Sequence, residues 1–434
     1  ILKNQLFGIA ITELTSLLSR RSLYCSKTAN GKYSICDEFD TESGNILFDK
    51  IQHTWKKKKC EYCGASQAEY DRDEILETHA YHFIHTDKPE EIFNMKFDVI
   101  VGNPPYQLSD GGFGASATPV YNKFVQQAKK LNPRFLSMII PSRWFAGGRV
   151  GELTQFREEM LNDTRVRIMH DFIHSNECFP GVEIKGGVNY FLWDRDNRGL
   201  CKIYTHFKNN KPFAYERPLL EEGATTFIRY NESISILRKV LKLDEEKFSK
   251  SVSANDPFGY DVRVKNSMKR DKPKFEYKPF TNSVEFYYYG WQKKGIGYIN
   301  KTTIRKNAEW VKRYKVYITK AYGAGEGFPH QILNKPILGQ PSSCCAETYL
   351  LIGPFSSKNE AQNVITYIKT KFFRFIVLLK KNTQEARKAV YQFVPTQDFT
   401  QPWTDEKLYK KYDLNTEEIN FIESMVRPME IDNG

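Results

Sequence analysis

Residues 97–106, with the sequence FDVIVGNPPY, decide how the first half of the chain folds. The part from Phe97 to Gly102 is a nearly continuous apolar run, which is typical of a strand buried in a parallel sheet. The tetrapeptide Asn103-Pro104-Pro105-Tyr106 follows this strand directly. Because ligands of a doubly wound sheet bind at the carboxyl ends of its strands, we expect the tetrapeptide at the reactive edge of the sheet.

Strands and helices are predicted to alternate around this run. We expect strands at 5–11, 80–86, 97–102, 135–140, 166–173 and 187–193, and helices at 13–21, 119–131 and 151–163. This alternation predicts an α/β, Rossmann-like domain with a parallel sheet. From about residue 206, prolines, aromatic clusters and short alternating runs predict a second domain of mixed α/β type, with helices near 358–370 and 415–426. We therefore divide the chain into residues 1–205 and 206–434.

The tetrapeptide also predicts a chemistry. The exocyclic amine of adenine is a poor nucleophile, because its lone pair is delocalised into the ring. The side-chain oxygen of Asn103 and the carbonyl of Pro104 can accept hydrogen bonds from that amine and free the lone pair for attack on a methyl sulfonium, while Pro104 and Pro105 stiffen the backbone. Tyr106 can stack on a base that has left the duplex. A plain turn after a strand is the alternative, but it does not explain a tyrosine in this register.

With these residues the chain resembles, over nearly its whole length, the gamma-class adenine-N6 DNA methyltransferases that are TaqI-like and occur in type IIG restriction–modification proteins. The resemblance implies S-adenosylmethionine as cofactor and double-stranded DNA as partner. It implies that Asp87, 16 residues before Asn103, contacts the cofactor's adenosine; the alternative is a surface Asp that caps a turn. It also implies that Phe179 stacks on the flipped adenine opposite Tyr106, with a plain core aromatic as the alternative.

The chain departs from the family pattern in its cofactor half. The family's Phe-x-Gly-x-Gly cofactor loop would precede residue 5, so we expect the chain to begin partway into a longer protein, with that loop or a nuclease upstream. Gly8 and Ala10 fall where the family contacts the cofactor, but Ala10 stands where the family usually has an acid. A glycine string at 322–328 is interpreted as a loop of the DNA-reading domain, because no strong helix follows it.

Residues 22–78 are predicted to hold a zinc-binding insertion. Cys60 and Cys63 are separated by two residues, Gly64 permits a tight turn, and His79 follows after fifteen residues, a spacing that suits tetrahedral zinc. The fourth ligand is open among His53, His82, His85, Cys25 and Cys36. We favour His53, since His85 would lie near the cofactor end of its strand. Two unrelated cysteines in a loop are the alternative; a zinc ion here would be structural.

Positive charge is concentrated in one segment. The net charge is +12, and residues 251–320 hold 16 Lys and Arg against 6 Asp and Glu, together with 14 aromatic residues. Cations that neutralise phosphates, mixed with rings that stack on bases, favour a nucleic-acid surface, although a solvated basic face is the alternative. The second domain is therefore expected to be a DNA target-recognition domain, with DNA contacts from Arg263, Lys265, Lys293, Lys294 and Arg313.

The remaining bulk properties narrow the function classes. The sequence has no run of 18 apolar residues and no signal peptide, so we expect no membrane span and a cytoplasmic location. The leading hypothesis is a site-specific DNA adenine-N6 methyltransferase of a restriction–modification system. Methylation of RNA or of a protein glutamine amide is one alternative. A sequence-specific DNA-binding module without catalysis is the other.

Overall fold

The computed structural model describes residues 1–36, 38–70, 81–108, 118–147, 153–207, 212, 214–262, 273–289, 295–322, 327–381 and 384–429. The chain forms two compact units, Ile1–Pro218 and Leu219–Gly434. The division falls later than the residue 205 expected from composition. The reason is that Cys201–His206 and Ala214–Arg217 form two further strands, which pair with the sheet of the first unit.

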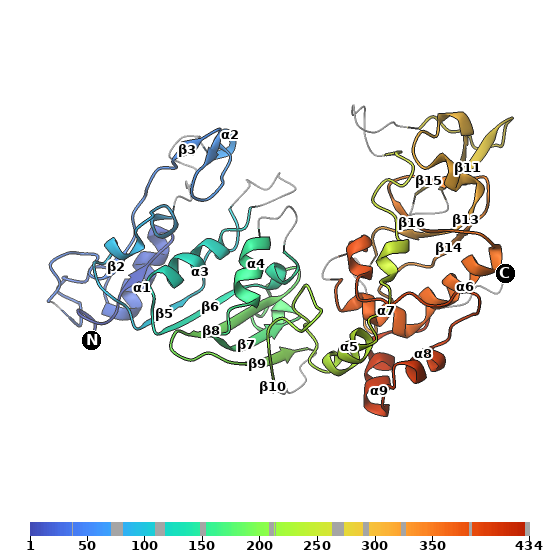
Figure 1. The fold of residues 1–434 in the computed structure, drawn as a ribbon. Helices are drawn as coiled ribbons and strands as arrows, with labels where there is room; N and C mark the ends of the chain where they lie inside the picture. The colour runs from blue at the N-terminus through green and yellow to red at the C-terminus, as the bar shows by residue number, and fades with distance from the viewer. Residues whose placement is uncertain are drawn as a thin grey trace. The chain divides into compact units, whose positions relative to one another are not determined.

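A six-stranded sheet is the centre of the first unit (Figure 1). Its strands are β5 (Val99–Gly102), β6 (Phe135–Pro141), β7 (Val166–Phe172), β8 (Val188–Asp194), β9 (Cys201–His206) and β10 (Ala214–Arg217), in the spatial order β10-β9-β7-β8-β6-β5. β8 is antiparallel to both of its neighbours, so β5, β6, β7 and β9 all run in the same direction. The predicted α/β class with a largely parallel sheet is confirmed.

Three helices of the first unit agree with the sequence prediction: α1 (Glu13–Tyr24), α3 (Tyr121–Lys130) and α4 (Thr154–Leu161). α1 begins where it does because Thr12 and Thr15 form a capping box that satisfies the first free N–H groups. α3 and α4 lie on the same face of the sheet (Figure 1), and the rings of Tyr121 and Phe156 join them with centroids 6.2 Å apart. Both rings are buried, so they contribute to the core of this unit.

The prediction of a strand at 80–86 is wrong, because His82–Ile84 form the 3-10 turn η1. One carbonyl of this turn and one just after it accept hydrogen bonds from α3. The side-chain amide of Gln127 donates to the carbonyls of Phe83 and Thr86, at 2.9 and 2.7 Å. The Phe83 ring packs against that of Phe124 at 5.9 Å. An apolar run that looks like a strand is therefore held as a turn by the helix beside it.

Two further expectations about strands need correction. The predicted strand at 5–11 shrinks to β1 (Gly8–Ile9), which pairs in parallel with β2 (Ile46–Leu47) in a separate two-stranded sheet. β5 was expected to be buried on both faces, but Val99 and Val101 are 56% and 74% exposed. These two side chains point to the same face of β5, so one face of the strand is exposed; β5 is also the terminal strand of the sheet, paired with β6 alone within the described residues.

The rest of the first unit is a polar segment with little regular structure. It contains a hairpin of β3 (Trp55–Lys56) and β4 (Lys59–Cys60) and the short helix α2 (Gln67–Tyr70). A small core of Tyr24, Ala29, Phe39 and Ile46 holds the segment that precedes this hairpin.

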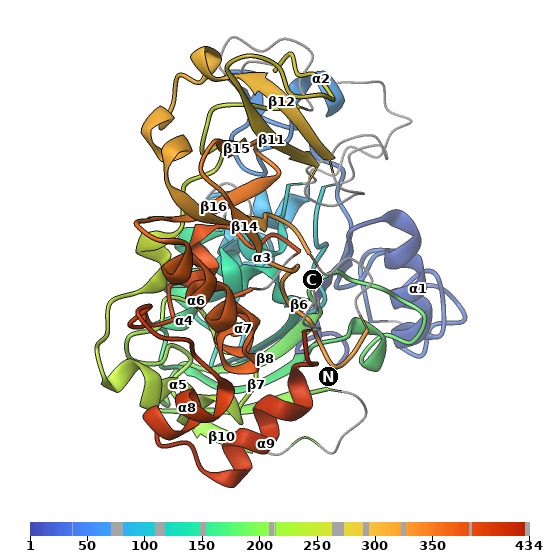
Figure 2. The ribbon, with the colours of Figure 1, turned by 90° about the vertical axis from the view of Figure 1, so that its right-hand side faces the viewer.

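The second unit is mixed α/β, as predicted. Its strands are β11 (Ser283–Tyr289), β12 (Gly295–Asn300), β13 (Tyr314–Thr319), β14 (Ile337–Gly339), β15 (Ser343–Cys345) and β16 (Tyr349–Phe355), in two sheets of order β12-β11-β15 and β14-β13-β16. Its helices are α5 (Ser233–Lys242), α6 (Lys358–Lys369), α7 (Lys371–Leu378), α8 (Asp405–Lys411) and α9 (Thr416–Met425). Within this unit β11, β12 and β15 lie at one end and α8 and α9 at the other (Figure 2). None of the helices described in either unit is long and apolar enough to cross a membrane.

Candidate active site and metal cluster

The tetrapeptide Asn103-Pro104-Pro105-Tyr106 begins immediately after the last residue of β5. Asn103 is exposed, Pro104 is buried, and Tyr106 is half-buried. β5 and β6 are parallel, with Gly102 opposite Met138, so the tetrapeptide lies at the same sheet edge as the residues that follow β6. The structure thus presents an amide side chain on a backbone anchored by a buried proline.

The backbone on both sides of residues 109–117, which lie outside the described residues, is paired. The N–H of Val120 donates to the carbonyl of Tyr106 at 3.3 Å, and the N–H of Leu108 donates to the carbonyl of Thr118 at 3.0 Å. These bonds connect the tetrapeptide to the start of α3. The backbone of Tyr106 is therefore fixed between the end of β5 and the start of α3.

Tyr106 has a buried phenol. Its hydroxyl oxygen has no hydrogen-bond partner among the described residues. Burial, with a smaller effect from the neighbouring Cys178 thiol, raises the pKa of Tyr106 to about 12. The phenol is therefore neutral at physiological pH. The Cys178 thiol, next to Phe179 in the sequence, thus acts on the phenol of the tetrapeptide.

Phe179 is half-buried and follows the 3-10 turn η4 (Ser175–Glu177). Its N–H donates to the carbonyl of Ser175 at 2.7 Å, and its carbonyl accepts the N–H of Val182 at 3.0 Å. The side chain of Ser175 ties the same loop together through bonds to the backbone of Val182 and Ile184, at 2.8 and 2.7 Å. These bonds fix the backbone on both sides of Phe179, while the stacking role of its ring and of the Tyr106 ring stays a prediction.

A buried polar network at this sheet edge was missed in the sequence. It joins Ser142, at the end of β6, to Asp171 in β7 and Asn189 in β8. The Ser142 hydroxyl donates to the Asp171 carboxylate at 2.8 Å, and the Asn189 amide donates to the Ser142 hydroxyl and to the carbonyl of Ile140, at 3.1 and 3.3 Å. Asp171 and Asn189 are fully buried. The available signal was an acid and an amide within the strands predicted at 166–173 and 187–193, because such side chains are rarely buried unless they are paired.

The predicted cofactor residues are divided between two places. Asp87 is exposed, accepts a 3.4 Å hydrogen bond from the Tyr62 hydroxyl, and lines an open groove of about 570 Å³. Thr86, Lys123 and Gln127 line the same groove; the residues of the tetrapeptide do not. Gly8 and Ala10 belong to the β1–β2 region instead, where their N–H groups donate to the carbonyls of Asn45 and Leu47, at 3.0 and 2.8 Å.

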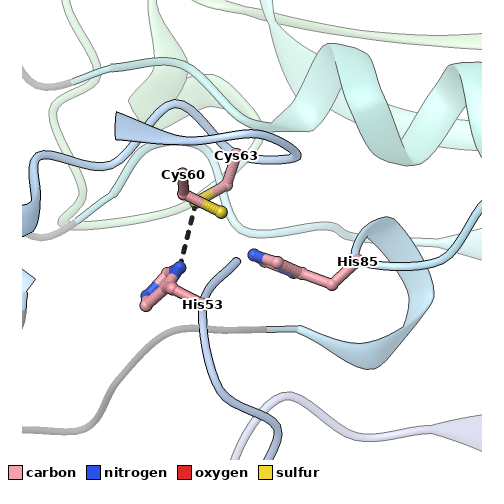
Figure 3. Close-up of side chains that lie close together, drawn as sticks. All are labelled: His53, Cys60, Cys63 and His85. Carbon is pink, nitrogen blue, oxygen red and sulfur yellow. Dashed lines mark hydrogen bonds between the residues drawn. The ribbon is translucent and has the colours of Figure 1, made fainter. Parts of the chain in front are cut away.

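Four potential metal ligands come together beside this groove: His53, Cys60, Cys63 and His85 (Figure 3). One ligand atom from each lies within 4.8 Å of all the others. Cys63 Sγ and His53 Nδ1 are 3.4 Å apart. The prediction of Cys60, Cys63 and His53 in one cluster therefore agrees with the geometry, and we name these four residues the metal cluster.

The remaining ligand candidates lie elsewhere. His79 lies outside the described residues. The reason for setting His85 aside was wrong, because η1 is a turn that directs His85 toward the two sulfurs (Figure 3). His82 instead contacts the Asp49 carboxylate, at 3.2 Å. Cys25 is exposed at the end of α1, and Cys36 packs against the core around Tyr24.

Burial sets the electrostatics of the cluster. It raises the pKa of the Cys63 thiol to about 12 and lowers the pKa of His85. Without a cation the Cys63 thiol is therefore protonated at neutral pH and the His85 imidazole is uncharged. A neutral imidazole is the form that binds metals, and a bound cation favours the thiolate.

Of the residues predicted to contact DNA, Arg263, Lys265, Lys293 and Lys294 lie outside the described residues. Arg313 is described. It is exposed on the second unit, directly before β13, and its guanidinium donates to the Ser356 hydroxyl at 3.0 Å.

Comparison with known proteins gives a consistent result for the first unit. Residues 4–179 match the family model described as Eco57I restriction-modification methylase. A protein of Mycoplasma pneumoniae described as an uncharacterized adenine-specific methylase is 36% identical over 230 residues, which cover 48% of this chain and 54% of that protein. The chain thus spans about half the length of this curated relative.

Solved structures of restriction–modification enzymes are similar at a lower level. A nuclease-deletion mutant of the type ISP enzyme LlaGI with a DNA substrate mimic has a TM-score of 0.41 and 9% identity, covering 89% of this chain and 39% of that one. The type IIL enzyme MmeI in complex with DNA has a TM-score of 0.37 and 10% identity, covering 76% and 52%. The family match, which includes β5 and the tetrapeptide, confirms the predicted resemblance: residues 4–179 are similar to the Eco57I restriction-modification methylases.

Proposed function

We propose that this chain transfers a methyl group from S-adenosylmethionine to N6 of a flipped adenine in double-stranded DNA, as part of a restriction–modification system. One observation carries the proposal. Asn103-Pro104-Pro105-Tyr106 follows β5 at the carboxyl edge of the sheet, inside the segment that matches the methylase family. This edge is where a doubly wound sheet binds its ligands.

The residues at the edge suit activation of an aromatic amine. The exposed Asn103 amide and the carbonyl of Pro104 offer acceptors for the two N–H groups of adenine N6, and the buried Pro104 restricts their movement. Hydrogen bonding to both N–H groups localises the nitrogen lone pair. With the cofactor bound, the lone pair of N6 would bond to the methyl carbon as the carbon–sulfur bond gave its electron pair to sulfur, and N6 would then release one proton to solvent.

The cofactor supplies an electrophilic methyl group on a sulfonium. The predicted cofactor residues of this chain fit that cofactor in part. Asp87 presents an exposed carboxylate in a groove of about 570 Å³, a volume in the range of ligand pockets, and could accept hydrogen bonds from an adenosine. Gly8 lies in β1 and Ala10 directly after it, and neither residue lines the groove that contains Asp87.

The base would be held by stacking. Tyr106 is half-buried, and Cys178, next to Phe179, lies close to it. Two rings from these neighbouring loops could take the two faces of an adenine outside the duplex. The second unit would bind the DNA duplex. Its support is the positive charge and the aromatic residues of 251–320, including the exposed Arg313.

Replacing Asn103 by Ala tests the proposal. We expect Asn103→Ala to abolish transfer of labelled methyl groups to DNA while the affinity for DNA changes less than twofold, because the side chain acts on the amine and not on the phosphates. Asn197→Ala, an exposed asparagine of the same unit in the turn after β8, is the matched control and should have normal activity. Normal transfer by Asn103→Ala would refute the mechanism. Wild-type transfer to RNA or to a protein amide, but not to DNA, would identify one of the other substrates.

A further inference from the structure

We propose that His53, Cys60, Cys63 and His85 bind one structural Zn²⁺ ion, which fastens the β3–β4 hairpin to the turn η1 and so fixes the position of Asp87. The ligand set of two thiolates and two imidazoles is one that tetrahedral zinc prefers. Its parts come from a hairpin and a turn that are separate in sequence. The metal would therefore act as a cross-link within the first unit.

The hairpin is shaped to present two sulfurs. Trp55 pairs with Cys60 and Lys56 with Lys59, so the connecting loop is Lys57-Lys58, and both of these residues have positive φ, 51° and 65°. This is the tight two-residue turn that suits twisted strands, formed here without glycine. A second tight turn follows, in which Gly64 has a φ of 78° and its N–H donates to the carbonyl of Cys60 at 3.0 Å. The second turn folds Cys63 back beside Cys60.

His85 is oriented as a metal ligand. Its Nδ1 lies 2.8 Å from the carbonyl of Tyr81, and a carbonyl can only accept, so Nδ1 carries the proton and donates. Nε2 then holds the free lone pair. Nε2 is buried and has no hydrogen-bond partner among the described residues, and the ring points toward the two sulfurs (Figure 3). Metal-bound histidines usually have this arrangement, with the second ring nitrogen bonded to a backbone carbonyl or carboxylate.

The spacing of the ligand atoms allows a tetrahedral ion after a small contraction. Zinc–sulfur and zinc–nitrogen bonds of about 2.3 and 2.0 Å place neighbouring ligand atoms roughly 3.3–3.8 Å apart. The pair Cys63 Sγ and His53 Nδ1 is at 3.4 Å, and all four atoms are within 4.8 Å. Small rotations about the side-chain bonds, which shift the ligand atoms by about 1 Å, would bring the four residues to bonding geometry.

The metal cluster is connected directly to Asp87. Tyr62 lies between Cys60 and Cys63, its ring contacts that of His85 with centroids 5.7 Å apart, and its hydroxyl donates to the Asp87 carboxylate at 3.4 Å. Asp87 itself is two residues after His85. Fixing His85 and the hairpin thus fixes both the backbone and a hydrogen-bond partner of Asp87. The consequence for cofactor binding rests on the proposed function, whereas binding of zinc does not.

Elemental analysis of the purified full-length protein tests the metal site directly. We expect about one zinc per chain in the wild type and near-background zinc in Cys63→Ser and His85→Ala. The matched controls Cys25→Ser and His82→Ala, which change the same residue types outside the metal cluster, should keep the metal. A wild type without zinc after expression in zinc-supplemented medium, or His85→Ala with its full zinc content, would overturn the proposal.

A second variant keeps the test decisive if His85→Ala does not fold. His85→Cys should fold and retain zinc, and its Co²⁺-substituted form should gain about half again in thiolate charge-transfer absorption, as expected for three thiolates in place of two. Unchanged absorption would show that residue 85 is not a ligand.

Equilibrium dialysis with S-adenosylmethionine tests the consequence for Asp87. Removal of zinc by a chelator should weaken binding at least fivefold in the wild type and by less than twofold in Asp87→Asn, because the loss acts through Asp87. An equal loss in both proteins would show that the metal does not act through this residue. A protein that holds zinc but never binds S-adenosylmethionine would contradict the proposed function and leave the zinc site intact.

Discussion

Tyr106 offers a test that separates the ring from its hydroxyl group. The hydroxyl oxygen is buried without a hydrogen-bond partner among the described residues, and burial of such a group costs about 1–3 kcal/mol. Because the residue as a whole is only half-buried, we take the lower end of this range. Tyr106→Phe should therefore raise the free energy of unfolding by about 1 kcal/mol, while the ring that stacks on the base remains. Tyr33→Phe, in which the parent side chain is 78% exposed, is the control and should have unchanged stability.

Tyr106→Ala should have a different effect, since it removes the ring. Stacking of an aromatic side chain on a base contributes about 1–3 kcal/mol, so capture of 2-aminopurine at the target position should weaken roughly 5- to 150-fold. Urea unfolding measures stability, and 2-aminopurine fluorescence with duplex DNA measures capture. Destabilisation by Tyr106→Phe would show that the hydroxyl has a partner after all. Unchanged capture by Tyr106→Ala would refute the stacking role.

Three further predictions use other parts of the first unit. Ser142→Ala should lower the free energy of unfolding by about 2–4 kcal/mol in urea, because it removes a hydrogen bond to the buried Asp171 carboxylate and one from the Asn189 amide; the exposed Ser22→Ala should change it by less than 0.5 kcal/mol. Burial alone would raise the pKa of Asp163, but hydrogen bonds and charges from Arg165 and Lys129 outweigh burial and hold that pKa well below its usual range. The stabilisation from Asp163 is therefore full above the ordinary carboxyl pKa and is lost as the pH falls below about 4, so acid unfolding monitored by circular dichroism should depend less on pH in Asp163→Asn. Phe179→Ala should weaken capture of 2-aminopurine by the same order as Tyr106→Ala; an unchanged signal would exclude Phe179 from the base site.

The sequence predicted most regular elements of the first unit correctly, because their patterns are local. Thr12 caps the first turn of α1, and the apolar run of 135–140 forms β6. The prediction for 80–86 was wrong because Gln127, more than 40 residues away, takes the carbonyl groups that a strand would have offered to a neighbour. No local pattern contains that information.

The same error affected the metal cluster. The Cys60 and Cys63 spacing is a local signal, and His53 could be chosen by its proximity in sequence. His85 was set aside on the assumption of a strand, whereas the turn η1 directs it to the sulfurs. The network of Ser142, Asp171 and Asn189 was missed for a related reason, since its members lie directly after β6, on β7 and on β8, and the pairing order of these strands cannot be read from spacing.

The catalytic claim is tested most directly by the product of the reaction. The full-length protein would be incubated with tritiated S-adenosylmethionine and unmethylated genomic DNA, and the DNA digested to nucleosides and separated by chromatography. The account predicts that the label appears in N6-methyladenine, and that Asn103→Ala gives none. Label in another nucleoside, or no label in a protein that binds both S-adenosylmethionine and DNA, would contradict it.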